Sequence, residues 1–213
     1  MKGSEALQLF RFRLARFTAD ATTLTDEMLL VEMNLAQKRL EEEACLPWFL
    51  ISEMATEQTV PHDERVQLPD TFIRELETDS LWLVEDSGKL LPLGKAPLDA
   101  LRERFADVGE AKPRGYAISG NYFRLRPVPD TIYNLRMSFF EHDASVVKDV
   151  ENRWLKYETD LLIAEAGQVV ATLYLRDDKA AGAFGTWRQE RYAKMKANED
   201  ARTLTNMPGT PED

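Results

Sequence analysis

The sequence predicts an α+β fold: mainly a helical bundle, with an inserted small antiparallel β lobe and an extended C-terminal helix and tail. Three observations lead to this prediction. Apolar residues recur at helical spacing in residues 24–40 and again in 160–176. Between these segments, short apolar runs alternate with polar residues and are separated by turns that contain Gly and Pro. A long, highly charged stretch, 177–204, follows the second helical segment.

The first segment of the chain admits two interpretations. The run FRFRLARF alternates like a strand, but an apolar series with spacings of three, four and three residues is helical: Leu7, Phe10, Leu14 and Phe17. The helix is favoured because the pattern extends back to Leu7. The interleaved arginines resemble a basic nucleic-acid site, yet the acidity of the whole chain favours a solvated helix face.

Residues 22–43 carry the clearest helical pattern. Thr23 or Thr25 can cap the helix, and acidic residues follow in the first turn. Two apolar stripes run side by side along it, the first formed by Leu24, Met28, Val31 and Leu35 and the second by Leu29, Met33, Ala36 and Leu40. Two adjacent stripes predict a wide apolar face that packs against two neighbours.

The middle of the chain reads mostly as β structure. Residues 48–60 look extended, and residues 65–76 are expected to pass from a turn into a short helix or an irregular segment. Two apolar runs around Asp86-Ser87-Gly88 predict a hairpin. Pro97 opens a short predicted helix, at a position where a first helical turn tolerates proline.

A second hairpin and a long strand are predicted within residues 115–140. Gly120-Asn121 is a favourable pair for the tight turn of the hairpin. In the strand that follows, one face carries the apolar side chains Tyr133, Leu135, Met137 and Phe139. We expect these strands to form one small antiparallel sheet, whose apolar face packs on the helices and whose polar face or turns meet a neighbouring protein.

The last third of the chain is predicted to be helical. In residues 160–176, the polar side chains fall on one narrow stripe, as in a largely buried helix: Glu165, Gln168, Thr172 and Arg176. The predicted domains are a helical bundle of residues 1–80 and 143–202, a β-rich lobe of residues 81–142 and a flexible C-terminal tail of residues 203–213.

Composition limits the classes of function. The chain has 213 residues, is 44% hydrophobic and carries a net charge of −10, so it can bury a core but is not expected to grip DNA phosphates or anionic membranes. Cys45 is the single cysteine, which favours a reducing compartment. The first residues lack the apolar stretch of a signal peptide, and we expect a soluble protein with no membrane partner.

No catalytic or metal-binding pattern stands out. His62-Asp63-Glu64 could supply metal ligands, but the histidine follows a proline in an expected loop, and Cys45 has no CxxC partner. The sequence contains no GxSxG, Walker A or GxGxxG motif. The AAGAFG stretch of residues 180–185 is expected to be a helix-packing surface. We therefore predict no catalytic residues, no metal site, no cofactor and a structural or binding role.

Aromatic residues on the late, charged helix indicate where a partner would bind. Tryptophan, tyrosine and arginine are enriched at interface hot spots. The predicted interface with a partner protein consists of Phe184, Trp187, Arg188, Arg191, Tyr192 and Met195. The other interpretation is that Phe184 and Trp187 simply pack on the bundle.

The order of several stretches resembles the head-to-tail adaptor, or connector, proteins of tailed bacteriophages, especially the short-tailed type. These stretches are LLVEMNLAQKRLEEE, WFLISEMATEQTV, VQLPDTFIRE, YAISGNYFRLRPVPDTIYNLRMSFF, NRWLKYETDLLIAEA and RYAKMKANEDAR. The most telling combination is a Tyr-x-Ile-x-Gly turn with a Pro-x-Pro break, followed by Asn-x-Trp-Leu before an apolar helix. The likeness spans about residues 25–202, and residues 81–108 are its least typical part.

The resemblance implies a structural virion protein in the neck or tail region, assembled in the host cytoplasm. Such proteins form a ring of twelve subunits that joins the portal protein to the tail or nozzle protein. The resemblance then implies that the six interface residues of the late helix meet the portal protein or a neighbouring subunit. Double-stranded DNA passes through the ring without specific binding, which suits an acidic chain. Two alternatives stay open: a phage-encoded hydrolase, which would need a buried carboxylate in a cleft, and a monomeric binding protein that regulates assembly.

Overall fold

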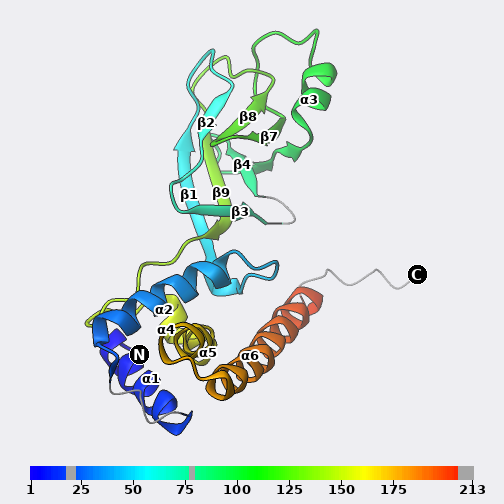
Figure 1. Cartoon of the computed structure of the whole chain (residues 1–213). Helices are drawn as coiled ribbons and strands as arrows, with labels where there is room; N and C mark the ends of the chain where they lie inside the picture. Colours follow the sequence, from blue (N-terminus) through cyan, green and yellow to red (C-terminus); the bar gives the residue numbers. More distant parts are fainter. Residues whose placement is uncertain (18–22, 77–79, 206–213) are drawn as a thin grey trace. The chain divides into compact units, whose positions relative to one another are not determined.

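The structure is a computed structural model and describes residues 1–17, 23–76 and 80–205. The chain divides into two compact units (Figure 1). Unit 1 comprises residues 1–50 and 142–213, and unit 2 comprises residues 51–141. Unit 2 is therefore inserted into the chain of unit 1.

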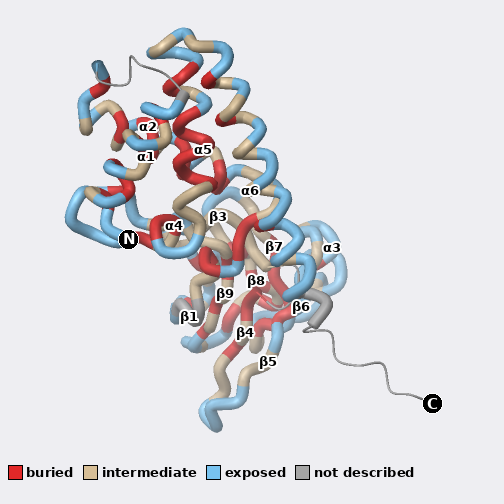
Figure 2. Tube along the Cα trace, turned by 90° about the horizontal axis from the view of Figure 1, so that it is seen from below, coloured by how far each residue is buried: buried red, intermediate tan, exposed pale blue. Residues whose placement is uncertain are grey.

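Unit 1 is helical. Its elements are α1 (Gly3–Phe17), α2 (Asp26–Glu41), the 3₁₀ turn η2 (Trp48–Leu50), α4 (Arg153–Tyr157), α5 (Thr159–Val169), the π-helical segment η3 (Val170–Leu175) and α6 (Asp178–Thr205). Helices α1, α2 and α6 surround α5 (Figure 1). Residues 161–167 of α5 are all buried, and this helix is the red centre of unit 1 in Figure 2.

Local sequence explains why these helices form where they do. In α1, Leu7, Phe10 and Leu14 are buried, so the helical interpretation of the first segment is confirmed. Thr25 caps α2, because its side-chain oxygen accepts a hydrogen bond from the Met28 N–H at 3.2 Å. This hydrogen bond satisfies one of the backbone N–H groups that have no partner within the first turn, and it fixes where the helix begins.

Only one of the two apolar stripes of α2 is fully packed. The second stripe is buried as expected: Leu29, Met33, Ala36 and Leu40. In the first stripe Leu24 is buried, but Val31 and Leu35 are exposed. The prediction that α2 buries both stripes is thus wrong for the single chain.

Unit 2 contains nine strands and one helix among its described residues. The strands are β1 (Ile51–Gln58), β2 (Arg65–Gln67), β3 (Phe72–Glu75), β4 (Leu81–Val84), β5 (Leu90–Pro92), β6 (Gly94–Lys95), β7 (Gly115–Ser119), β8 (Tyr122–Arg126) and β9 (Asn134–Glu141). The helix, α3 (Leu98–Arg104), begins directly after Pro97.

These strands form two sheets. One sheet has the order β1-β9-β4-β5, with β3 also paired to β9, and the other has the order β2-β8-β7-β6. The β4–β5 hairpin and the β7–β8 hairpin are confirmed, with Gly120 in a left-handed conformation (φ 60°) at the second turn. All pairs are antiparallel except β6 with β7.

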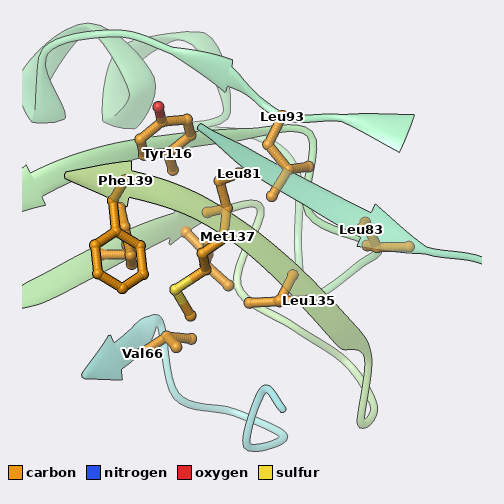
Figure 3. Close-up of a cluster of buried hydrophobic side chains, with 10 residues drawn as sticks. Val66, Leu81, Leu83, Leu93, Tyr116, Leu135, Met137 and Phe139 are labelled. Carbon is orange, nitrogen blue, oxygen red and sulfur yellow. The ribbon is translucent and has the colours of Figure 1, made fainter. Parts of the chain in front are cut away.

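A single apolar core holds unit 2 together. It draws buried side chains from both sheets: Val66, Leu81, Leu83, Leu93, Tyr116, Phe123, Leu125, Leu135, Met137 and Phe139. Figure 3 shows Leu135, Met137 and Phe139 of β9 beside Leu81 of the neighbouring strand β4 within this cluster. The alternation predicted for β9 is therefore confirmed.

The prediction of what the apolar face of residues 115–140 packs against was wrong. The face was expected to pack on helices, with residues 115–140 in one sheet. Instead, β7 and β8 belong to one sheet and β9 to the other, and their apolar faces contribute to the same core cluster. Two facing sheets bury one another, so the core of unit 2 is made within residues 66–139.

The predicted fold class also needs correction. The structure is mixed α/β, with 46% helix and 21% strand over two sheets and six helices in its described part, and is not mainly a helical bundle. The difference comes largely from residues 51–75, where β1, β2 and β3 lie in a segment that was assigned to the helices. Strands β2 and β3 are short and form because they pair with the distant β8 and β9.

Candidate assembly site

The six residues predicted as an interface share one face of α6, and that face is turned toward unit 1. Phe184 and Met195 are buried. The other four are half-buried: Trp187, Arg188, Arg191 and Tyr192. In the single chain, this face is therefore occupied by contacts within unit 1.

Phe184 fixes the closest approach of α6 to α5. Its ring lies where a side chain on Gly167 would be, because a Cβ built at Gly167 would overlap the ring atoms. Gly167 is thus required by the packing of α6 against α5. Ala180, one turn earlier on α6, is also buried, in line with a packing surface at residues 180–185.

Arg188 joins α6 to two other parts of unit 1. Its Nε donates a hydrogen bond to Glu165 Oε2 of α5 at 2.9 Å, and its other guanidinium nitrogen pairs with Glu43. Arg39 of α2 donates to the other oxygen of Glu165 at 2.8 Å. Burial disfavours the charged guanidinium, but the hydrogen bonds to Glu165 and Glu43 outweigh it and raise the pKa of Arg188.

A second group of charges anchors the same face of α6 near the start of α5. Arg191 contacts Glu158 Oε2 at 3.3 Å and Asp160 at 3.7 Å. Burial raises the pKa of Glu158, and the nearby Arg191 opposes this shift. Arg13 of α1 lies 4.8 Å from the centre of the Trp187 ring, a cation–π distance.

A buried polar network fixes the chain where it re-enters unit 1. Glu41 of α2 is almost fully buried and accepts hydrogen bonds from Trp154 Nε1 (3.0 Å) and from the Asp143 N–H (3.2 Å). His142 Nδ1 lies 2.6 Å from its second oxygen. Asn152 caps α4 through the Leu155 N–H at 2.8 Å and donates to Gln37. Residues 142–154 are thereby held on α2.

Two hollows accompany these elements. One, about 370 Å³, lies in unit 1 beside the network and is lined mainly by polar and charged side chains, among them Asn34, Lys38, Glu42 and His142. The other, about 570 Å³, lies in unit 2 between β3 and the segment that leads into α3, and is lined by Phe72, Ile73, Leu98 and Ile118 among others.

The residues considered for metal binding are not gathered. Among the described residues, no three His, Cys, Asp or Glu side chains are placed to hold a metal ion. His62 occupies a turn and pairs with Glu110 at 2.5 Å, and Cys45 is half-buried. No helix in the described part of the chain is long and apolar enough to cross a membrane.

The sequence interpretation missed the surface that the single chain leaves uncovered. Val31 and Leu35 on α2 are exposed, and so are Leu173 and Tyr174 on η3 and Phe12 on α1. The first apolar stripe of α2 could have revealed this surface in the sequence. Within unit 1, the neighbours of α2 cover its second stripe but leave Val31 and Leu35 of the first exposed. The predicted tail lies largely in residues 206–213, outside the described residues.

Comparison with known proteins supports the resemblance to phage adaptor proteins that the order of sequence stretches indicated. No curated protein matches the chain. The model of the SU10 adaptor protein family matches residues 4–211, which is nearly the whole chain. This family consists of structural phage adaptors, which argues against an enzyme and implies a virion component that associates with other phage proteins. The chain belongs to the SU10 adaptor protein family.

Proposed function

We propose that this protein is the head-to-tail adaptor of its phage: a ring that joins the portal protein to the tail or nozzle protein and lets the genome pass. The observation that carries the proposal is the family match along residues 4–211. The ring has twelve subunits, lies in the neck of the virion and assembles in the host cytoplasm.

Charge supports a role around a DNA channel. The net charge of −10 gives little attraction for phosphates, so double-stranded DNA can slide through the ring without being held. Uncovered apolar residues support assembly, because exposed apolar clusters in soluble proteins usually mark interaction surfaces.

The six residues on α6 support assembly by holding that helix in place. Replacing both Trp187 and Tyr192 with alanine removes the contact of Trp187 with Arg13 of α1 and that of Tyr192 with Arg188 of the same helix, and should weaken assembly. Circular dichroism must show that the variant is folded. A folded variant that assembles like the wild type would remove this face from the proposal.

The ring is tested by mass. The purified protein is measured by light scattering after size exclusion, alone and after mixing with the portal protein of the same phage. A ring-sized complex in either sample supports the proposal. A monomer in both samples overturns it.

A further inference from the structure

One surface of unit 1 combines exposed apolar side chains with an incompletely paired carboxylate. We call it the α2–η3 patch, and it consists of Val31, Leu35, Leu173 and Tyr174. Tyr174 donates a hydrogen bond from its hydroxyl to Glu32 Oε1 at 2.7 Å, which places it against α2. Val31 and Leu35 are four residues apart, and Leu35 lies three residues after Glu32, so they neighbour this contact on the helix surface.

Glu32 lies beneath this patch with one oxygen unused. The residue is 4% exposed, and its Oε2 has no hydrogen-bond partner in the described part of the chain. Its Oε1 receives only a neutral hydroxyl, and no arginine or lysine in the described part forms an ion pair with it. A buried carboxylate oxygen without a donor is costly, so this site favours an incoming cation.

The outer face of α1 offers a cation with apolar surroundings. Phe12 is 60% exposed, whereas Phe10 and Leu14, which belong to the apolar stripe on the other side of the helix, are buried. The Arg16 guanidinium lies 5.8 Å from the centre of the Phe12 ring. Arg16 is exposed and, among the described residues, forms no ion pair. Arg11 and Arg13, in contrast, are paired with Asp26 and Asp160.

Charge explains why a specific contact is needed. Each copy carries a net charge of −10, so two copies repel one another at long range. A contact between copies must therefore set a cation of one opposite a carboxylate of the other. Arg16, flanked by Phe12, and Glu32, flanked by Tyr174 and Leu35, are complementary in both charge and apolar character.

We propose that the Phe12–Arg16 face of one copy docks on the α2–η3 patch of the next, with Arg16 placed over the buried carboxylate of Glu32. The two surfaces are different, so the contact is head-to-tail, the type that generates a closed ring when the rotation closes. The inference rests on the proposed ring and names the residues that join its subunits.

Two charge-changing variants test this contact, each of which damages one surface only. Arg16→Glu spoils the α1 face, and Leu173→Glu spoils the patch. Both side chains are exposed, so the fold should persist, which circular dichroism checks. Each variant alone should lose the ring, or need about tenfold or more protein to form it, because a like charge faces Glu32 or enters the apolar patch.

Mixing the two variants is the decisive step. The intact patch of the Arg16→Glu copy can still bind the intact α1 face of the Leu173→Glu copy, so the mixture should form dimers that cannot extend to a ring. Matched controls are Arg102→Glu on α3 and Ile132→Glu before β9, which replace an exposed arginine and an exposed aliphatic residue of unit 2 by glutamate. Both controls should assemble like the wild type.

The outcomes separate this contact from the ring itself. Rings formed by either variant at wild-type concentration overturn the contact and leave the proposed function standing. Absence of dimers in the mixture also overturns it, because a head-to-tail contact requires complementation. Wild-type protein that stays monomeric with and without portal overturns the proposed function and this inference with it. Glu32→Gln, which keeps the contact to Tyr174 but removes the charge, should weaken assembly less than Leu173→Glu does.

Discussion

The two units of this chain specify the packing of their interiors in different ways. Among the described residues, unit 1 buries three carboxylates and two amides, and unit 2 buries two hydroxyl-bearing residues. These are Glu32, Glu41, Glu165, Gln37 and Asn152 in unit 1 and Thr59 and Ser80 in unit 2. Backbone ladders already fix the register of the strands in unit 2. Helices lack such ladders between them, and directional side-chain contacts specify which helix faces meet.

The largest effect should come from the apolar core of unit 2. Phe139→Ala leaves a cavity among Phe72, Leu81 and Met137, and we expect the free energy of unfolding to fall by about 3–5 kcal/mol. Urea unfolding measures this loss, and hydrogen exchange should show faster exchange in residues 51–141. If the backbone amides of α5 exchange faster to the same degree, the two units unfold together and not independently.

A smaller loss is expected when the polar network of unit 1 is broken. In Glu41→Gln a neutral amide oxygen replaces the carboxylate oxygen that accepts from both Trp154 Nε1 and the Asp143 N–H, and an NH2 group replaces the oxygen beside His142. Because these hydrogen bonds lose the carboxylate charge, stability should fall by about 1–3 kcal/mol. Glu42→Gln, at the next and exposed position, is the matched control and should change little. Equal urea midpoints for the two variants would mean that the network contributes no stability.

A comparable or smaller loss is expected at the contact between α5 and α6. Gly167→Ala places a methyl group against the Phe184 ring, and overpacking of this kind costs about 1–3 kcal/mol, partly offset by alanine's higher helix propensity. Gly182→Ala meets no atom within 4 Å and should stabilise α6 by about 0.5–1 kcal/mol. Thermal unfolding of both variants checks the sign: Gly167→Ala should unfold below the wild type and Gly182→Ala above it.

The smallest effect concerns a surface charge group of unit 1. Hydrogen bonds from Arg11 and Lys148 lower the pKa of Asp26 below its ordinary value of 3.8. Because the folded-state pKa is lowered, the contribution of Asp26 is fully present above its ordinary value and is lost as pH falls through the folded value. The group is solvent-screened, so the contribution should stay below about 1 kcal/mol.

Asp26→Asn tests this pH dependence. The difference in unfolding free energy between wild type and variant should be constant near neutral pH and shrink as pH drops below about 3.8, the ordinary value for an aspartate. A difference that grows on acidification would contradict the assignment. High salt at neutral pH should also reduce the difference, because surface pairs are screened.

Local patterns in the sequence predicted the elements that are defined by their own periodicity. The alternation around Met137 gave β9, and the spacing of Phe10 and Leu14 gave α1. Strand β2 has three residues and no pattern of its own, since it forms by pairing Val66 with Phe123. Contacts such as Glu41 with Trp154 join residues 113 positions apart, and no spacing rule can reveal them.

The candidate assembly site shows the same limit. Spacing could place Phe184, Arg188 and Met195 on one face of a helix, but not tell which way that face turns. Its direction depends on Glu165 and Glu158, which come from other segments and pair with Arg188 and Arg191. Val31 and Leu35 of the first stripe of α2 are exposed although they were predicted to be buried, because the sequence does not show how many neighbours a helix has in one chain.

The insertion of unit 2 has a consequence for synthesis on the ribosome. Ile51 pairs with Phe140 at the two ends of unit 2, so the chain leaves and returns at adjacent positions of one sheet. Unit 2 is complete before α5 emerges, while α1 and α2 still lack the helix that covers them. When unit 2 folds first, the two segments of unit 1 are separated by the distance between two paired strands and no longer by a flexible loop of residues 51–141. The entropic cost of bringing the two segments together is therefore lower. Early folding of unit 2 would thus favour the later association of the two segments of unit 1.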